Sequence, residues 1–263
     1  MTGLPQLTNV EILMLSAMPV TLKNVVKPFV PEAVLERWRR MRFHVEQKQA
    51  AGRPLQDVFS EIYEKGMWAQ TEGVRYHSGP GSEAAVTRGY EDFVVAYLDA
   101  HPEVQTLLDI GCGDFQVSNR ILARVSRPLR YIGCDIAPAV VAHNTATFGQ
   151  PGRIEFRHLN VADAQLPKAD LVTVREVFQH LSNETILAAL TNLRRAVPRA
   201  IITESLFMKP AAPNLDIVSG YRTRDGLKSG VYLDLPPFNL KISDRYNMPV
   251  NDDEQLTTLV VDL

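Results

Sequence analysis

The chain has 263 residues and 45% hydrophobic content, which is enough apolar sequence to build one large domain or two small ones. Its formal net charge of −2 argues against a general nucleic-acid-binding protein, since such proteins are usually basic. No apolar run approaches the roughly 20 residues that a membrane-spanning helix requires, and the two cysteines have no metal-ligand spacing, so we expect a cytoplasmic protein without a metal centre.

The first hundred residues are predicted to be mostly helical. The stretch PEAVLERWRRMRFHVEQKQ, residues 31–49, has apolar residues at helical spacing and a proline near the helix start. Residues 23–48 carry seven Lys or Arg against three Glu, so this segment is locally basic. A solvated helix face explains the charge most simply, and weak association with a membrane surface or a glycosyltransferase partner is the alternative.

The stretch EIYEKGMWAQTEGVRYHSGPGSE, residues 61–83, combines aromatic residues with the motif SGPGS at 78–82. The motif places a glycine on each side of a proline, so backbone freedom surrounds a fixed φ. We expect the segment to close as a lid over a bound ligand, and a simple linker is the alternative. The lid residues expected to touch the ligand are Trp68, Ser78 and Gly79.

From about residue 104 onward, short apolar runs alternate with segments of helical spacing. This alternation predicts an α/β fold with βαβ units and a mainly parallel seven-stranded sheet, closed by an antiparallel final strand. Prolines and glycine turns in residues 208–240 predict a long irregular excursion before the last two strands. The predicted strands are residues 104–110, 130–136, 154–159, 170–177, 199–205, 240–246 and 257–263, and the predicted helices between them are 116–126, 138–148 and 183–197.

The domain organisation expected from these patterns has two parts. Residues 1–85 form a helical N-terminal extension and the lid, and residues 86–263 form a ligand-binding domain.

The first predicted strand of this domain ends in DIGCGD, residues 109–114. A dinucleotide-binding turn would have a third glycine at position 116, where the chain has glutamine. A carboxylate directly before the turn adds nothing to a pyrophosphate site but complements a cationic ligand. We therefore expect this turn to bind a ligand with positive groups, through Asp109, Gly111, Cys112 and Gly113.

The second and third strands deliver further polar groups to the same edge, because the carboxyl ends of parallel strands meet there. Asp135 ends the second strand and is placed to accept both hydroxyls of a ribose, with a cap of the following helix as the alternative. Asn160 and Asp163 follow the third strand and are expected at an adenine edge, with ordinary turn polarity as an equal alternative. Their neighbours Ile136 and Val161 are included in the expected site.

The fourth strand ends in REVFQH, residues 175–180. Arg175 is expected to contact the ligand. His180 is the best candidate for a general base, with Glu176 one turn earlier, and a capping or packing histidine beside Ser182 is the alternative. Glu204 and Asp216 are further candidates, although no pattern in the sequence places them at the site.

The stretches LLDIGCGD, YIGCDIAP and LPKADLVTVREVFQHLS together resemble the class I S-adenosylmethionine-dependent methyltransferases over residues 104–207. The resemblance implies a Rossmann-like methyltransferase fold and S-adenosylmethionine as the cofactor. It implies the methionine portion near Asp109, the ribose at Asp135 and the adenine at residues 160–163. Phe115 departs from the family, because many members keep a third glycine there, and this implies a bulkier loop.

Residues 61–83 and the motif PPFNL at 236–240 are similar to bacterial methyltransferases of polysaccharide and glycan gene clusters. That similarity implies O-methylation of a sugar, a glycan or another small polar metabolite. The alternatives are a small-molecule N- or carboxyl-methyltransferase and a non-catalytic cofactor-binding scaffold in a biosynthetic complex. The motif REVFQH stands where methyltransferases of nucleic-acid or protein amino groups carry an Asn-Pro-Pro-Tyr type motif, so a nucleic-acid partner is not expected.

Overall fold

The computed structural model describes residues 32–69 and 75–263. The described residues fall into two compact units, the first of residues 32–49 and the second of residues 50–69 and 75–263. Helix α3 (Glu32–Ala50) accounts for all the described residues of the first unit, and its last residue is counted in the second. It agrees with the helix predicted for residues 31–49, whereas the start of the basic segment lies outside the described residues. No helix in the described ranges is both long enough and apolar enough to cross a membrane.

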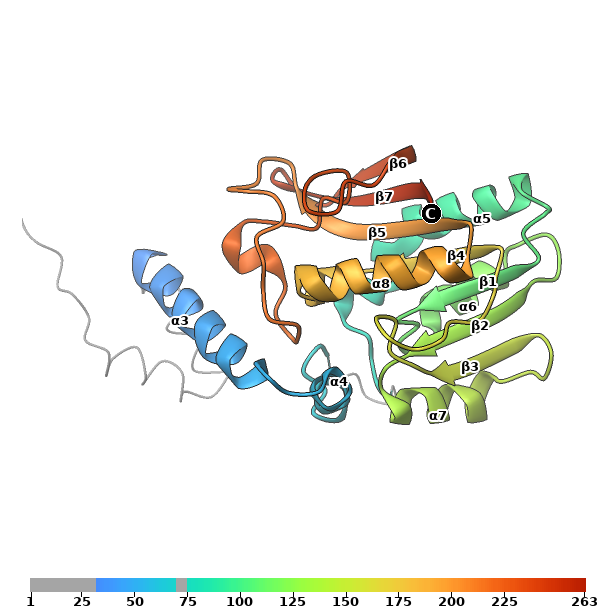
Figure 1. The fold of residues 1–263 in the computed structure, drawn as a ribbon, viewed down its shortest axis with the longest axis horizontal. Helices are drawn as coiled ribbons and strands as arrows, with labels where there is room; N and C mark the ends of the chain where they lie inside the picture. The colour runs from blue at the N-terminus through green and yellow to red at the C-terminus, as the bar shows by residue number, and fades with distance from the viewer. Residues whose placement is uncertain (1–31, 70–74) are drawn as a thin grey trace, which may run out of the picture. The chain divides into compact units, whose positions relative to one another are not determined.

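The second unit is built around a seven-stranded sheet with the order β3-β2-β1-β4-β5-β7-β6 (Figure 1). Strand β7 pairs antiparallel with β5 and β6, and the other neighbours pair in parallel. All seven predicted strands form, and the antiparallel final strand is confirmed. The strands are β1 (Thr106–Ile110), β2 (Arg130–Asp135), β3 (Ile154–His158), β4 (Leu171–Arg175), β5 (Arg199–Phe207), β6 (Ile242–Pro249) and β7 (Glu254–Asp262).

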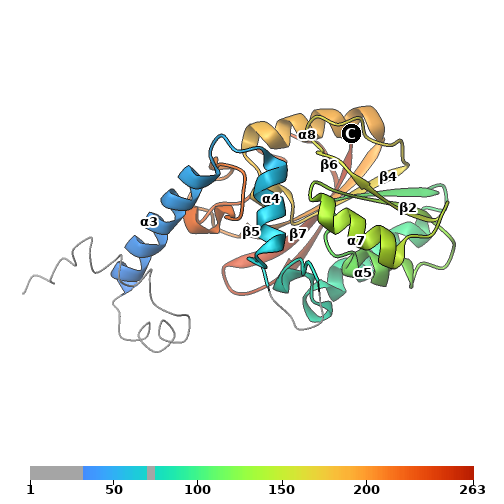
Figure 2. The ribbon, with the colours of Figure 1, turned by 90° about the horizontal axis from the view of Figure 1, so that it is seen from below.

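The helices of this unit are α4 (Leu55–Glu64), α5 (Ala84–Ala100), α6 (Gln116–Leu122), α7 (Pro138–Phe148) and α8 (Asn183–Ala196), with short 3-10 helices η2 (Pro80–Ser82), η3 (Phe178–His180) and η4 (Arg224–Leu227). Helices cover both faces of the sheet, and Figure 2 shows α8 above the strands and α5 below them. Strand side chains alternate between the two cores: Leu108 and Ile132 pack on the α8 side, and Leu107 and Tyr131 pack on the α5 side.

Helix α8 begins where its sequence predicts. Ser182 is the N-cap, and its Oγ accepts a hydrogen bond from the Thr185 amide at 3.2 Å. Glu184 lies in the first turn, where a negative charge faces the positive end of the helix dipole. This start fixes the position of the short segment between β4 and α8.

Residues 208–241, between β5 and β6, form the irregular excursion that the sequence predicts. The excursion is packed against the protein, because Val231 and Leu233 are fully buried in the α8-side core. The Asn214 side chain holds it together by donating to the carbonyls of Tyr232 at 2.9 Å and Pro236 at 2.8 Å and accepting from the Tyr232 amide at 2.7 Å. The excursion is therefore a structural part of the second unit.

Candidate active site

A cavity of about 280 Å³ lies at the carboxyl ends of the parallel strands. The turns after β1, β2, β3 and β4 all contribute to its wall, as the topology of an open α/β sheet predicts. Helix α4 and the segment that ends in η2 complete the wall. Its polar and charged lining includes Ser78, Ser82, Asp109, Asp114, Ser118, Asp135, Asn160, Arg175, Glu176, Gln179, His180 and Thr185, and its apolar lining includes Leu55, Phe59, Trp68, Ile136, Val161, Val177 and Leu181.

The glycine turn after β1 brings backbone close to the cavity. Gly111 has a φ of +70°, which favours glycine, and a Cβ built there would lie 2.4 Å from Val177 Cγ2. Behind the turn, Asp109 accepts hydrogen bonds from the hydroxyls of Ser118 at 2.6 Å, Tyr131 at 2.6 Å and Thr173 at 2.9 Å. Burial raises the pKa of the Asp109 carboxyl, and these three donors oppose the rise.

Phe115 occupies the position where a third glycine was expected. It keeps the left-handed backbone that a glycine would adopt, with a φ of +65°, and its ring is 1% exposed. The ring packs against Tyr131, Phe148 and Phe156 at centroid distances of 5.0–5.2 Å, and it does not line the cavity. The expectation of a bulkier loop is therefore not met on the cavity side, because the ring turns into the α5-side core.

Asp135 ends β2 with its carboxylate on the cavity wall. One oxygen accepts from the Gly113 amide at 3.1 Å and the other from the Ala137 amide at 2.9 Å, so the group is both a turn anchor and a wall residue. Burial raises its pKa to about 6, although these backbone donors favour the charged form. Each oxygen keeps a lone pair that a ligand hydroxyl can use.

The turn after β3 places Asn160 and Val161 on the cavity wall. Asn160 Oδ1 accepts from the Ala162 amide at 3.1 Å, and its Nδ2 donates to Asp163 at 3.0 Å. Asp163 is exposed and does not line the cavity, so it acts on the site through Asn160.

The motif SGPGS is bound to the glycine turn through a reciprocal pair of hydrogen bonds. The Ser78 amide donates to Asp114 Oδ2 at 3.1 Å, and the Asp114 amide donates to Ser78 Oγ at 2.8 Å. Gly113 lies beside this pair, since a Cβ built on it would lie 2.2 Å from Ser78 Oγ. The lid segment and the glycine turn are thus joined directly at the cavity.

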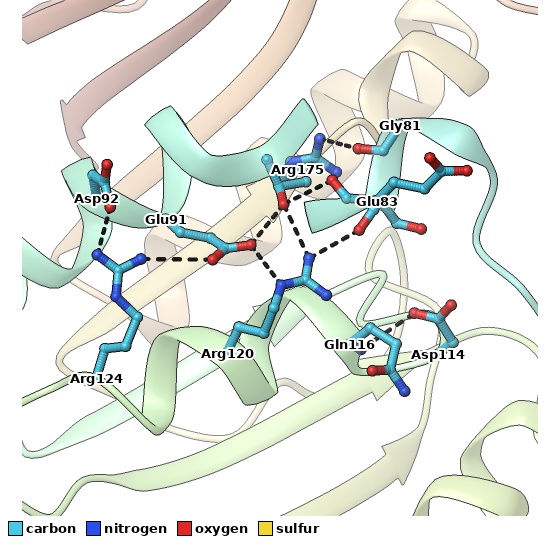
Figure 3. Close-up of polar contacts among 11 residues, drawn as sticks. Gly81, Glu83, Glu91, Asp92, Asp114, Gln116, Arg120, Arg124 and Arg175 are labelled. Carbon is cyan, nitrogen blue, oxygen red and sulfur yellow. Dashed lines mark hydrogen bonds and ion pairs between the residues drawn. The ribbon is translucent and has the colours of Figure 1, made fainter. Parts of the chain in front are cut away.

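Two arginines hold the η2 turn from the other side (Figure 3). Arg120 on α6 donates to the Ser82 carbonyl at 2.9 Å and pairs with the buried carboxylate of Glu91 at 2.7 Å. Arg175 at the end of β4 donates to the Gly81 carbonyl at 2.6 Å and lies over the Tyr90 ring at 5.4 Å. Because Arg175 also lines the cavity, it connects the lid segment to the carboxyl edge of the sheet.

Four buried side-chain atoms of cavity residues have no hydrogen-bond partner within the described part of the chain. They are Trp68 Nε1, Arg175 Nε, Glu176 Oε1 and His180 Nδ1. A buried polar atom without a partner costs about 1–3 kcal/mol, so a group of them on one cavity indicates a place where a ligand supplies the missing partners.

Glu176 and His180 are the titratable groups at the β4 end of this wall. Glu176 has a φ of +56°, a strained conformation for a non-glycine residue that is common at functional sites. Its Oε2 accepts from Gln179 at 3.0 Å and Ser205 at 3.2 Å, and burial raises its pKa. Burial lowers the pKa of His180 to about 4, so the imidazole, which lies 5.4 Å from the Trp68 ring, is neutral at physiological pH.

The structure brings most of the expected site residues to one cavity. Two of the expected residues, Gly113 and Asp163, do not line the cavity but hydrogen-bond to the lining residues Asp135 and Asn160. Neither Glu204 nor Asp216 lines it. Sequence reasoning missed the contribution of α4, whose Leu55 and Phe59 reach the wall; the only signal is the amphipathic spacing of LQDVFSEIYE.

Gly111→Ala should lower the free energy of unfolding by about 1–3 kcal/mol, because alanine at a positive φ is strained and its methyl group would meet Val177. Urea denaturation measures the loss. Gly152→Ala is the matched control, since Gly152 has a φ of +77° but no atom within 4 Å of its Cβ position. If the two variants lost the same free energy of unfolding, backbone strain alone would explain the loss and the Val177 contact would play no part.

Hydrogen exchange tests the predicted lid. The described parts of the segment, residues 61–69 and 75–83, should exchange more slowly when S-adenosylhomocysteine is added, because Ser78 and Gly79 line the cavity and a ligand there would hold them in place. Equal exchange with and without the compound would make the segment a linker.

The chain is similar to known methyltransferases in part of its sequence and in its fold. Residues 108–199 match the family model of a methyltransferase domain. No curated protein matches the chain. Magnesium protoporphyrin IX methyltransferase (ChlM) from Synechocystis PCC 6803, with bound SAM, has a TM-score of 0.53 and 16% identity, covering 81% of this chain and 99% of its own.

Two further solved structures share the fold. The N-methyltransferase NodS from Bradyrhizobium japonicum WM9, in complex with S-adenosyl-l-homocysteine, has a TM-score of 0.50 and 13% identity, covering 76% of this chain and 98% of its own. The [4+2]-cyclase SpnF has a TM-score of 0.53 and 16% identity, covering 78% and 93%. These likenesses establish the fold, and the different reactions in their names leave the reaction of this chain to its own residues.

The strand order, with β7 antiparallel, and the cavity at the carboxyl edge define a Rossmann-like methyltransferase fold. Within this fold, residues 108–199 match the model of a methyltransferase domain, so the central part of the second unit is a methyltransferase domain.

Proposed function

We propose that this protein transfers the methyl group of S-adenosylmethionine to a hydroxyl group of an uncharged sugar, glycan or small polar metabolite. The observation that carries the proposal is that one cavity has two polar regions. Asp109, Gly111 and Asp135 form a wall suited to the cofactor, and a second polar cluster, Glu176 and His180, lies at the end of β4. Glu176, His180 and Trp68 line the cavity, and each has a buried polar atom without a hydrogen-bond partner among the described residues.

The residues on the wall fit the cofactor. Four lining carboxylates, Asp109, Asp114, Asp135 and Glu176, face a single lining guanidinium, Arg175, among the described residues, so the cavity favours a ligand with positive groups. Asp135 has free lone pairs for ribose hydroxyls, Ile136 and Val161 offer apolar surface to an adenine, and Gly111 allows close approach of the methionine portion. Trp68, Ser78 and Gly79 would cover the cofactor from the lid side.

Bound S-adenosylmethionine supplies a methyl carbon that its sulfonium already activates, so the protein contributes mainly alignment and proton removal. A hydroxyl acceptor must lose its proton as the new bond forms. His180 is the proposed general base: it is neutral because burial lowers its pKa to about 4, and it therefore has a free lone pair. The Glu176 carboxylate on the same wall would offset the charge of the imidazolium that results.

The charge of the cavity favours an uncharged acceptor over an anionic one. A carboxylate or phosphate acceptor would need a cation to bind it, and one Nη of Arg175 already donates to the Gly81 carbonyl. The Trp68 ring lies edge-on to Tyr63 at 4.8 Å and tilted against Phe59 at 6.3 Å between centroids, and Trp68 would offer its own aromatic face to a sugar ring. Glycan methylation is the assignment that this combination favours.

Titration calorimetry and a radiolabelled methyl screen test the proposal together. We expect S-adenosylmethionine and S-adenosylhomocysteine to bind, and label to pass to methyl glucoside in preference to glucuronate or glucosamine. Label on glucosamine nitrogen alone would indicate an N-methyltransferase. Tight binding of the cofactor with no transfer to any of the acceptors would favour a non-catalytic scaffold.

A further inference from the structure

The segment Phe178–Asn183 leads from the turn after β4 into the first residue of α8 and contains His180. Its backbone groups cannot all pair with one another. Its only regular element is the single turn η3, so most of its amides and carbonyls need partners from elsewhere. Those partners come from β5 and from the excursion 208–241, which are distant in sequence. The position of His180 therefore depends on groups outside its own element.

Arg224 in η4 supplies the largest share of these partners. Its side chain is 1% exposed, and all of its hydrogen bonds go to two short stretches of chain. It donates from Nη1 to the carbonyls of Phe178 at 3.1 Å and Gln179 at 3.3 Å, from Nη2 to the Leu181 carbonyl and Asn183 Oδ1 at 2.8 Å each, and from Nε to the Leu215 carbonyl at 2.9 Å. The guanidinium thus binds the backbone immediately before and after His180.

Other groups complete the hold on the segment. Glu204 in β5 accepts from the amides of Phe178 at 2.8 Å and Gln179 at 3.0 Å. From the excursion, the Gly220 amide donates to the His180 carbonyl at 2.9 Å, Ser219 Oγ accepts from the Ser182 amide at 2.8 Å and Asp216 accepts from the Asn183 amide at 2.7 Å. Arg224 is the only one of these groups that bonds on both sides of His180.

We propose that Arg224 is a positioning residue for His180, and that the excursion 208–241 serves to deliver its guanidinium to the His180 segment. The inference rests on the proposed role of His180 in methyl transfer. It assigns a function to the irregular, proline-rich part of the chain, which contributes no residue to the cavity lining.

The geometry requires arginine and not merely a positive charge. The planar guanidinium has five donors in a fixed fork, and here they reach three carbonyls of one segment, a side-chain oxygen of the same segment and one carbonyl of the excursion. A lysine ammonium at this place would keep the charge but could not bond both Phe178 and Leu181 from one rigid group. Arg224→Lys therefore keeps the positive charge and loses the guanidinium geometry, whereas Arg224→Gln loses both.

The ionisation of His180 reports on its position. Burial is the main cause that lowers its pKa, the charge of Arg224 acts in the same direction, and the backbone of Gly220 and Tyr221 acts in the opposite direction. A His180 side chain released from the segment would move toward water and titrate nearer the ordinary value of about 6.5. If Arg224 only stabilised other parts of the fold, its substitution would leave the His180 titration unchanged.

The experiment is a pH titration of ¹⁵N-histidine-labelled protein by NMR in the presence of S-adenosylhomocysteine, with the His180 signal identified by its loss in His180→Gln. In the wild-type protein the signal should not titrate above about pH 5. In Arg224→Lys and Arg224→Gln it should titrate near about 6.5, and the rate of radiolabelled methyl transfer to an acceptor should fall about 10²-fold. The affinity for S-adenosylhomocysteine should stay at the wild-type level in both.

Lys209→Gln, at an exposed cation of the same excursion, is the matched control and should behave like the wild type. A wild-type titration and turnover in Arg224→Lys would show that charge alone suffices and would overturn the proposal. If neither Arg224 variant folds, Ser219→Ala takes their place, because it removes the hydrogen-bond partner of the Ser182 amide. An upward shift of the His180 pKa in this variant would support the proposal that the excursion positions His180, and an unchanged pKa would contradict it. If the His180 titration shifts in the Arg224 variants but no sample, the wild type included, transfers a methyl group, then Arg224 still positions His180 and the proposed reaction is wrong.

Discussion

Substitution of His180 by glutamine should lower methyl transfer by about 10²–10⁴-fold and leave the affinity for S-adenosylmethionine unchanged. Glutamine has a similar volume and can still form hydrogen bonds, but it cannot accept the proton of the acceptor hydroxyl. His180 lines the β4 end of the cavity, away from the Asp135 carboxylate that is proposed for the ribose. Initial rates of radiolabel transfer at saturating cofactor measure the effect, and calorimetry measures the affinity.

His101→Gln is the matched control for this substitution. His101 follows α5 and precedes β1, at the amino edge of the sheet, where its ring stacks on Tyr97 at 4.0 Å. Its replacement should leave both turnover and affinity at wild-type values. A wild-type rate in His180→Gln would remove His180 from the chemistry, and a loss of cofactor binding or of cooperative unfolding would make it a structural residue.

Strands β1 to β5 could be predicted from the sequence because buried parallel strands appear as short continuous apolar runs. Their boundaries could not be predicted to the residue, as the fourth strand shows. It was predicted to extend to residue 177, but it ends at Arg175 because Glu176 adopts a φ of +56°. The sequence gives no signal for this turn, because Glu176 is neither glycine nor asparagine. Its strained backbone is accompanied by hydrogen bonds that Gln179 and Ser205 donate to its side chain.

Site residues next to strand ends were accessible to sequence reasoning, whereas residues that act from a distance were not. Asp109 and Asp135 could be placed because each lies one residue before the end of a predicted strand. The direction of the Phe115 ring could not be predicted, because its pocket is formed by residues of β2, α7 and β3. Arg224 was not identified for the same reason, because its partners in residues 178–183 lie 41–46 positions earlier in the chain.

Asp135→Asn should weaken the binding of S-adenosylhomocysteine by about 1.5–3 kcal/mol, the range for hydrogen bonds made to a charged group. The amide keeps one oxygen to accept from the Gly113 or Ala137 amide, but it loses the negative charge and one acceptor for the ribose hydroxyls. Calorimetric titration measures the loss, with Asp252→Asn, in the exposed turn between β6 and β7, as the control. Unchanged affinity in a folded Asp135→Asn protein would show that the ribose assignment is wrong.

The pH dependence of the wild-type protein tests the same assignment without any substitution. Burial raises the pKa of Asp135 to about 6, so the carboxyl is ionised above that pH and protonated below it. A protonated carboxyl has lost its charge and offers a poorer acceptor, so the affinity for S-adenosylhomocysteine should be constant above about pH 7 and fall about tenfold per pH unit below about 6. Burial also raises the pKa of Asp109, but a step caused by Asp109 would persist in Asp135→Asn. The assignment to Asp135 therefore requires that the step near pH 6 is present in the wild type and absent from the variant.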